Sequence, residues 1–306
     1  MAQKALVTGG AGFIGTYLVA RLLRDGNDVV IYDNLKRSSK KKLEQFAGSP
    51  RLKFVEGDIR DYPTLREAMR GATVVYHLAA QSNVMGAIED PDYSVTTNVM
   101  GTHNVLRAAA DERARVVFTS SREVYGEVEV LPVAEDRPLA AKNPYGASKV
   151  AGEAYCRTFA NVHKMNVQVV RLANVYGAGD SGRVIPLWLT AAQEGRELKV
   201  FGGAQIIDFL WVGTAVDALV HASTHDLPGP VNIGSGVATS ILDLAKRILE
   251  VSKSKSELKR EPAREAEVAK FVADITLMKS LGLRPESDPL EHLEELVSAY
   301  PAGTKG

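Results

Sequence analysis

The sequence predicts an α/β protein built on a doubly wound parallel sheet, and three observations support this fold class. Short runs that are almost entirely apolar recur along the chain, as expected of strands covered on both faces. Amphipathic segments such as "GTYLVARLLRDG" and "GTHNVLRAAADERA" lie between them. Short connections between alternating strands and helices favour a parallel sheet with right-handed crossovers. The predicted strands are "KALVTG" (4–9), "DVVIYD" (28–33), "LKFVEGD" (52–58), "TVVYHLA" (73–79), "RVVFTSS" (115–121) and "VQVVRLANVYG" (167–177).

The alternation of strand and helix changes after about residue 178. "GAGDSGRVIP" is typical of a loop, "LWLTAAQEG" predicts a helix, and "LKVFGG" and "PVNIGSG" predict short strands. We therefore expect a first domain of residues 1–177, to which 205–235 also belong. Residues 178–306 are expected to form a smaller C-terminal α/β lobe that binds substrate.

The composition excludes several classes of protein. Lys and Arg together number 37, as do Asp and Glu, so no net charge favours nucleic acid or an anionic membrane. The single cysteine, Cys156, excludes an internal disulfide framework and fits a reducing compartment. The N-terminal segment lacks the features of a signal peptide, and no stretch reaches the roughly 18 apolar residues that span a bilayer. We expect a cytoplasmic protein that binds neither nucleic acid nor membrane.

A glycine-rich segment, "VTGGAGFIG", follows the first predicted strand and opens the first helix. Gly9 permits a tight turn, Gly12 lets a pyrophosphate approach the backbone, and Gly15 lets the helix pack closely on the strand. The N-terminus of the helix supplies N–H donors and the positive end of its dipole. With an acidic residue at the end of the second strand, this pattern predicts a Rossmann-type dinucleotide site.

Asp33 ends the second predicted strand, 18 residues after Gly15. A carboxylate there accepts hydrogen bonds from ribose hydroxyls and repels a 2′-phosphate, so it favours NAD over NADP. Lys36 and Arg37 follow closely; they either offset that preference in part or form a solvated basic turn, and the latter is favoured. Asp58, at the end of the third strand, either bonds the adenine amino group or caps the next helix.

"NPYGASK" contains Tyr145 and Lys149, whose spacing of four places both on one face of a helix. A nearby ammonium group and a positively charged nicotinamide stabilise a phenolate and lower the pKa of a tyrosine. Lys149 is also suited to hold the nicotinamide ribose. Ser121, at the end of the fifth strand, can orient a substrate hydroxyl for proton and hydride removal.

The chain resembles the extended short-chain dehydrogenase/reductases, in the branch that acts on nucleotide-sugars, and is most similar to their UDP-glucose 4-epimerase-like group. The matching stretches are "VTGGAGFIG", "YDNL", "GDIRD", "HLAA", "SSREVYG", "NPYGASK" and "RLANVYG", in the order in which the family has them. The resemblance covers essentially the whole chain and is strongest over residues 4–180.

The resemblance implies a role for each group of matching residues. Ser121, Tyr145 and Lys149 would carry catalysis, and the cofactor would be NAD. A UDP-sugar would be the substrate, and the protein would form a homodimer through the helices of 91–111 and 145–163. The residues implied to line the cofactor site are Gly9, Gly12, Phe13, Ile14, Gly15, Asp33, Asn34, Asp58, Ile59, Leu78, Ala79, Ala80, Asn98, Tyr145 and Lys149. Those implied to bind the nucleotide-sugar are Ser121, Asn174, which touches the diphosphate, Phe201, which packs on the base, and Arg264, which grips the diphosphate.

The chain departs from the family at two places. Ile207 stands where relatives usually have an arginine that pairs with a phosphate, so either the diphosphate site is altered or another arginine, such as Arg183, replaces it. Arg122 stands where 4,6-dehydratases have the acid that protonates the leaving hydroxyl, and it cannot donate a proton. Glu123, which follows, matches the base of those dehydratases and a glutamate of UDP-glucuronate decarboxylases.

Three interpretations of Arg122 are open: it binds a substrate carboxylate, it pairs with Glu123 or another acid, or it points to solvent. We expect an NAD-dependent nucleotide-sugar 4-epimerase. It would act on UDP-glucose and UDP-galactose, on their N-acetyl forms or on glucuronate forms, with Tyr145 as the base. The alternatives are a dehydratase or decarboxylase that uses Glu123, and a non-catalytic NAD(H) sensor. No metal site is expected, because His221 and His225 lack a third ligand nearby.

Overall fold

The computed structural model describes residues 3–303, which cluster into two compact units. Unit 1 comprises residues 1–126, 138–172 and 215–231, and unit 2 comprises 127–137, 173–214 and 232–306. Residues 127–137 and 173–177, which the sequence placed in the first domain, therefore cluster with unit 2. Of the segment 205–235, only 215–231 belongs to unit 1. Within the described chain, no helix is both long enough and apolar enough to cross a membrane.

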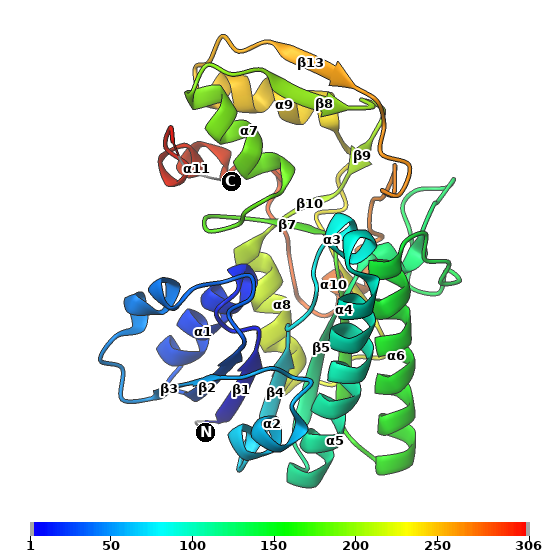
Figure 1. The fold of residues 1–306 in the computed structure, drawn as a ribbon. Coiled ribbons are helices and arrows are strands. Elements are labelled where there is room, and N and C mark those ends of the chain that lie inside the picture. Colours follow the sequence, from blue (N-terminus) through cyan, green and yellow to red (C-terminus); the bar gives the residue numbers. More distant parts are fainter. Residues whose placement is uncertain (1–2, 304–306) are drawn as a thin grey trace. The chain divides into compact units, whose positions relative to one another are not determined.

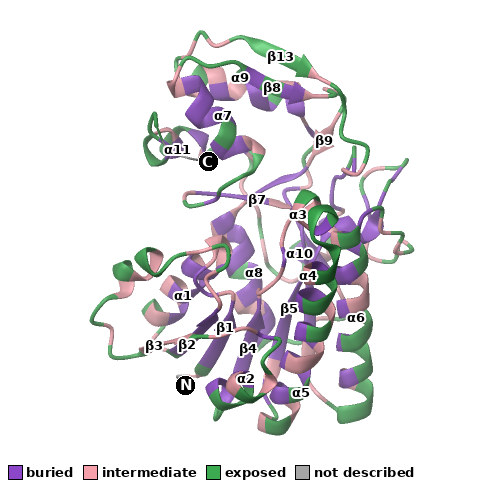
Figure 2. Ribbon diagram, viewed as in Figure 1, coloured by how far each residue is buried: buried purple, intermediate pink, exposed green. Residues whose placement is uncertain are grey.

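Unit 1 is built on a parallel sheet, which confirms the predicted fold class. The strand order is β11-β6-β5-β4-β1-β2-β3, and each described pair among β1 to β6 is parallel. Figure 2 shows most of these strands as the buried layer of the unit, which explains why their central residues are apolar. The edge strand β3 is the exception, since none of its residues is fully buried. The strands are β1 (Lys4–Thr8), β2 (Asp28–Asp33), β3 (Leu52–Glu56), β4 (Val74–His77), β5 (Arg115–Ser121), β6 (Val167–Leu172) and β11 (Val231–Ile233).

Helices cover the sheet of unit 1. One cluster of buried side chains joins the sheet to α2 (Tyr62–Met69), α5 (Thr102–Glu112) and α6 (Pro144–His163), which lie beside one another in Figure 1. Leu6 of β1 belongs to this cluster, so its neighbours Ala5 and Val7 face the other side. On that side α1 (Phe13–Arg24) is tied to α8 (Val212–Thr224) by an ion pair between Arg21 and Asp217.

Short helical segments fill the connections at the carboxyl ends of the strands, where a doubly wound sheet binds its ligands. The segment between β4 and α5 contains α3, α4 and a π-helix that continues directly into α5. A single turn of 3₁₀-helix follows β5. The segments are η1 (Lys40–Phe46), α3 (Val84–Glu89), α4 (Pro91–Val95), the π-helix η2 (Thr96–Gly101) and η3 (Arg122–Tyr125).

Unit 2 has its own core of buried side chains, contributed by its helices and by paired short strands. β7 pairs with β10 and β8 with β13 in parallel, and β9 pairs with β12 antiparallel. The strands are β7 (Asn174–Tyr176), β8 (Leu198–Phe201), β9 (Ile206–Ile207), β10 (Phe209–Trp211), β12 (Thr239–Ser240) and β13 (Leu258–Glu261). The helices are α7 (Val184–Gln193), α9 (Ile241–Val251), α10 (Thr276–Ser280) and α11 (Leu293–Ala299).

Buried Asp208 joins three segments of unit 2. Its carboxylate accepts hydrogen bonds from the backbone N–H groups of Ser235, Gly236 and Ala273 and from the Ser235 hydroxyl, at 2.7–3.1 Å. Asp208 is fully buried, so these four donors replace the water that an exposed carboxylate would bind.

Candidate active site

The glycine loop between β1 and α1 has the shape that a dinucleotide requires. Gly9 has φ of +72°, and a Cβ there would lie 2.7 Å from the backbone nitrogen of Ala79. A Cβ on Gly15 would lie 2.3 Å from the Gly9 carbonyl oxygen, so α1 approaches the loop as closely as glycine allows. A Cβ on Gly12 would meet only that oxygen, at 3.1 Å. The space beside Gly12 at the start of α1 is therefore open to a pyrophosphate, and the loop fits NAD.

The Asp33 carboxylate is part of the same loop structure. One oxygen accepts the backbone N–H of Ala11 at 3.0 Å and the other that of Leu35 at 2.8 Å. Burial raises the pKa of Asp33, and these hydrogen bonds act in the opposite direction. The side chain predicted to bind ribose thus also fixes the glycine loop against the segment that follows β2.

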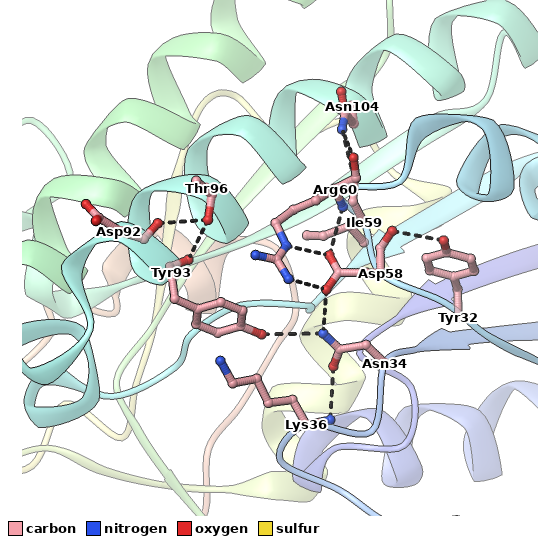
Figure 3. Close-up of polar contacts among 10 residues, drawn as sticks. All are labelled: Tyr32, Asn34, Lys36, Asp58, Ile59, Arg60, Asp92, Tyr93, Thr96 and Asn104. Carbon is pink, nitrogen blue, oxygen red and sulfur yellow. Dashed lines mark hydrogen bonds and ion pairs between the residues drawn. The ribbon is translucent and has the colours of Figure 1, made fainter.

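Asp58 lies in a polar cluster at the ends of β2 and β3 (Figure 3). The Arg60 side chain donates to both of its oxygens, at 2.9 and 2.8 Å, and the Asn34 amide donates at 2.9 Å. Burial alone would raise the pKa of Asp58, but these hydrogen bonds outweigh it and lower the pKa to about 2. The helix that follows is capped by Asp61, so the interpretation of Asp58 as the cap was wrong. Its contact with adenine stays a prediction.

Asn98 lies in the π-helix η2 and is 2% exposed. Its amide oxygen accepts the Gln81 backbone N–H at 2.7 Å, and its amide nitrogen donates to the Gln81 carbonyl at 3.1 Å. That nitrogen also donates to the Ser148 hydroxyl, at 2.9 Å. Asn98 therefore joins the loop of Leu78, Ala79 and Ala80 to α6, beside Lys149.

Helix α6 carries Tyr145 and Lys149. Asn143 caps the helix by accepting the Gly146 backbone N–H at 2.9 Å, and Pro144 occupies the first turn. The Lys149 ammonium lies 5.9 Å from the centroid of the Tyr145 ring and donates to the Thr119 carbonyl at 2.8 Å. Burial lowers the pKa of Lys149 to about 8, although Cys156 and Glu153 oppose the shift. The ammonium group of Lys149 thus lies close enough to Tyr145 to stabilise its phenolate form.

The turn after β5 brings Ser121 and Glu123 into contact. The Glu123 backbone N–H donates to the Ser121 hydroxyl oxygen at 3.2 Å. The Glu123 carboxylate is buried, and its two oxygens have separate partners: the Arg122 guanidinium at 2.9 Å and the Asn143 amide at 2.8 Å. Of the three interpretations of Arg122, pairing with Glu123 is the one observed.

A second buried ion pair joins helix α6 to strand β6. Glu153, one turn after Lys149, receives two hydrogen bonds from Arg171 of β6, at 2.9 and 2.7 Å, and one from the Ser120 hydroxyl at 2.5 Å. Arg171 also donates to the Tyr125 hydroxyl at 2.8 Å. These contacts hold α6 against β5 and β6, at the strand end where Ser121 lies.

Unit 2 contains the remaining residues that the sequence assigned to the substrate. The Arg264 guanidinium lies 3.9 Å from the centroid of the Phe201 ring, so these two are adjacent. Arg183 donates to the Val175 carbonyl at 3.2 Å, next to Asn174. Ile207, which replaces the usual arginine, packs against the core of unit 2. Substrate binding by these residues stays a prediction.

Several residues of the site were not identified from the sequence. Gln81, Thr119 and Asn143 contact predicted site residues only through folding, over separations of 17 to 30 residues. One of them had a local signal: Asn143 precedes a proline at the head of a helix, which is typical of an N-cap.

Comparisons with known proteins identify the family of this chain. The NAD dependent epimerase/dehydratase family matches residues 5–234. A putative UDP-glucose 4-epimerase of Methanocaldococcus jannaschii is 36% identical, over 96% of this chain and 97% of that protein. The crystal structure of UDP-glucose 4-epimerase from Thermotoga maritima with UDP-glucose has a TM-score of 0.92 and 30% identity, and the match covers 97% and 98% of the two chains.

A relative with a different reaction is equally similar in structure. The dTDP-glucose 4,6-dehydratase of Streptomyces venezuelae, with NAD bound, has a TM-score of 0.92 and 29% identity, over 97% of this chain and 96% of that one. The family is NAD-dependent, which confirms the predicted cofactor. From its matching residues and its sheet, the chain belongs to the NAD-dependent epimerase/dehydratase family, within the extended short-chain dehydrogenase/reductases.

Proposed function

We propose that the protein is a nucleotide-sugar 4-epimerase that acts on UDP-hexoses through a transient 4-keto sugar. Relatives named as UDP-glucose 4-epimerases match nearly the whole chain. They leave the reaction open, because dehydratases and decarboxylases share the fold. The choice between these reactions depends on the residues around Ser121.

Tyr145 is the proposed base for the sugar 4-hydroxyl. The Lys149 ammonium, 5.9 Å from the Tyr145 ring centroid, stabilises the phenolate form. The Ser121 oxygen accepts one hydrogen bond, from the Glu123 N–H, and its own O–H would donate to the substrate oxygen. The chemistry that NAD⁺ supplies when bound is reversible acceptance of the C4 hydride.

The observation that carries the proposal is the environment of Glu123. Elimination requires an acid for the leaving hydroxyl and a base for the C5 proton. Arg122 occupies the place of the acid and has no proton to give at working pH. Glu123, the only candidate base of the pair, is buried with one oxygen on Arg122 and the other on Asn143. These contacts favour a structural role for Glu123 and support epimerisation.

The test is NMR of the protein with NAD⁺ and UDP-glucose, UDP-N-acetylglucosamine or UDP-glucuronate in separate samples in deuterated water. Epimerisation predicts inversion at C4 with the C4 hydrogen retained and no deuterium in the sugar, and the sample that reacts identifies the substrate. Deuterium at C5 or C6, or release of CO₂, would instead establish elimination or decarboxylation. The matched variant Tyr145→Phe should retain NAD and lose at least 100-fold in turnover; a sensor would keep its function.

The same proposal includes a homodimer. Large apolar side chains are exposed on α4, η2 and α6, within the two segments that the sequence assigned to the dimer. Scattered exposed apolar residues are normal, but a group on adjacent helices is typical of an interface. A second copy that presents the same helices would cover them in a symmetric contact. The residues are Val95, Met100, Tyr155 and Val162.

A further inference from the structure

Residues 177–183, which we call the α7 loop, connect β7 to α7 in unit 2 and contain two glycines in the left-handed conformation. Gly179 has φ of +81° and Gly182 has φ of +70°. A Cβ on either glycine would meet nothing within 4 Å, so the loop is not packed closely on those sides. Glycine also gives a backbone more freedom than any other residue. The course of the α7 loop therefore depends on its polar contacts.

Asp180 and Arg183 make contacts within the α7 loop and with β7. The Asp180 carboxylate is buried; it accepts the Ser181 backbone N–H at 2.9 Å and lies 3.5 Å from the Arg183 guanidinium. Arg183 also donates to the Val175 carbonyl at 3.2 Å, so its guanidinium returns to β7. The Arg183 side chain is 41% exposed, which leaves it accessible to a ligand.

Strand pairing brings Ile207 to the same part of unit 2. β10 begins at Phe209, two residues after Ile207, and Phe209 is the register partner of Asn174, the first residue of β7. The Asn174 N–H donates to the carbonyl of Asp208, the residue after Ile207, at 3.0 Å. Arg183 is therefore anchored on the strand that begins beside Ile207, the residue that replaces the usual arginine.

Tyr300, which follows α11, contacts the α7 loop from the far end of the sequence. Its ring is buried in the core of unit 2, and its hydroxyl donates to the Gly177 carbonyl at 2.8 Å and to the Asp180 carbonyl at 2.9 Å. The hydroxyl has one proton, which the two acceptors share. The Gln193 amide of α7 holds Tyr300 in turn, because it donates to the carbonyls of Val297 and Tyr300 at 2.7 and 2.5 Å. Figure 1 shows α11, in red, close to α7.

We propose that Tyr300 is a positioning residue for the nucleotide-sugar. By fixing the α7 loop, it holds Arg183 where the guanidinium binds the diphosphate in place of the arginine that Ile207 replaces. A guanidinium matches phosphate oxygens in geometry and charge. A loop that is fixed before the ligand binds loses less freedom on binding, which strengthens affinity. The inference rests on the proposed function, because it takes the diphosphate of a UDP-sugar as the ligand of the α7 loop.

The test compares Tyr300→Phe, which keeps the ring in the core and removes only the hydroxyl, with Ser254→Ala. Ser254 also donates its hydroxyl to a carbonyl of unit 2, that of Ala192 on α7, at 2.7 Å. The dissociation constant of UDP is measured by calorimetry and that of NADH by fluorescence, and kcat and KM are measured with the UDP-sugar that reacts.

Tyr300→Phe should bind UDP about fivefold more weakly and raise KM by a similar factor, because two carbonyls of the α7 loop lose their donor. Its kcat should stay within about twofold, since the lost interaction is made equally in the ground and transition states. Its NADH affinity should not change. Ser254→Ala should match the wild type in all four measurements.

Two further measurements show whether Tyr300 acts through the α7 loop. Adding Tyr300→Phe to Arg183→Gln should weaken UDP binding no further than Arg183→Gln alone, because the two residues would act as one unit. Amide hydrogen exchange of Ser181 and Gly182 in the absence of ligand should be faster in Tyr300→Phe than in Ser254→Ala, because the loop opens more often.

Equal UDP affinity of Tyr300→Phe and the wild type would overturn the inference, and so would an equal loss in Ser254→Ala or a further loss in the double variant. If Tyr300→Phe does not fold, Gln193→Met removes the donor to the Tyr300 carbonyl, and an unchanged UDP affinity in that variant would overturn the inference. UDP binding does not require turnover. A wild type that binds UDP but epimerises no UDP-sugar therefore refutes the proposed reaction alone, and unchanged UDP affinity in an active Tyr300→Phe variant refutes the positioning role alone.

Discussion

The sharpest prediction concerns Glu123→Gln, which removes the buried carboxylate that pairs with the partly buried Arg122. The two side chains are 7% and 13% exposed. Breaking a buried ion pair by removing one partner costs about 3–5 kcal/mol, and the remaining hydrogen-bonding capacity of glutamine reduces this to an expected loss of about 2–4 kcal/mol. The free energy of unfolding, measured by urea titration, checks that value.

The same substitution should slow epimerisation without abolishing it. Glu123 contacts Asn143, the N-cap of the helix that carries Tyr145, and its backbone contacts Ser121. A displacement of about 1 Å at a catalytic group costs up to about 100-fold in rate. We therefore expect kcat to fall between about tenfold and 100-fold, with no change of product.

The double variant Arg122→Met/Glu123→Gln separates a positioning residue from a base. Removing both charges leaves no charge to be neutralised, so it should recover about 1–2 kcal/mol of the lost stability and part of kcat. If Glu123 were the base, the double variant would be as inactive as Glu123→Gln. A stable Glu123→Gln variant that is inactive and not rescued would refute our interpretation.

Three further predictions concern the lysine, the second unit and the dimer. Burial lowers the pKa of Lys149 to about 8. The folded state therefore releases this proton first, and the stability of wild type relative to Lys149→Met should rise between pH 8 and 10 by about 3 kcal/mol. Asp208→Ala should lower the free energy of unfolding by at least about 4 kcal/mol, because four buried donors lose their acceptor. Met100→Glu should produce monomers in light scattering, because it places a charge in the proposed interface.

Each of these three predictions has a control variant and a result that would contradict it. The free energy of unfolding of wild type relative to the control variant Lys41→Met should not rise between pH 8 and 10. If the free energies of unfolding of wild type and Lys149→Met changed in parallel with pH, the pKa of Lys149 would be the same in the folded and unfolded states. Asp243→Ala removes an exposed carboxylate and should lower the free energy of unfolding much less than Asp208→Ala does. An equal loss in both aspartate variants would show that the contacts of Asp208 contribute nothing special to stability. Leu187→Glu charges an exposed apolar side chain of unit 2 and should remain dimeric; a dimeric Met100→Glu would reject the helices as the interface.

The features that were predictable from the sequence are those that a short stretch of chain determines. The glycine loop works through three positions within seven residues, and the structure gives each a steric reason. The parallel sheet follows from strands that are apolar on both faces. The segments 127–137 and 173–177 were harder to place, because the chain passes between units there without a change in composition.

The contacts of Glu123 could not be read from the sequence in the same way. Arg122 is its neighbour in the chain, but adjacent side chains face each other only when the backbone turns, as it does in η3. Asn143 is 20 residues away, and its two roles, cap and partner of Glu123, depend on the packing of η3 against α6. The sequence therefore identified Arg122 and Glu123 as candidate residues but left three interpretations of Arg122 open.

This pairing gives a physical reason why one fold can serve different reactions. After β5 the chain turns so that residue 123 reaches both Ser121, through its N–H, and the cap of α6, through its side chain. A glutamate there connects the two elements that carry the proposed catalytic hydroxyls. With an acid as its neighbour, such a glutamate could take up and release protons during elimination. With Arg122 as its neighbour, its charge is neutralised and both oxygens are occupied, which fits the structural role that we propose for Glu123. Replacing Arg122 by Asp should therefore loosen the hold on Glu123, and deuterium at C5 of the sugar would be the first sign of a new reaction.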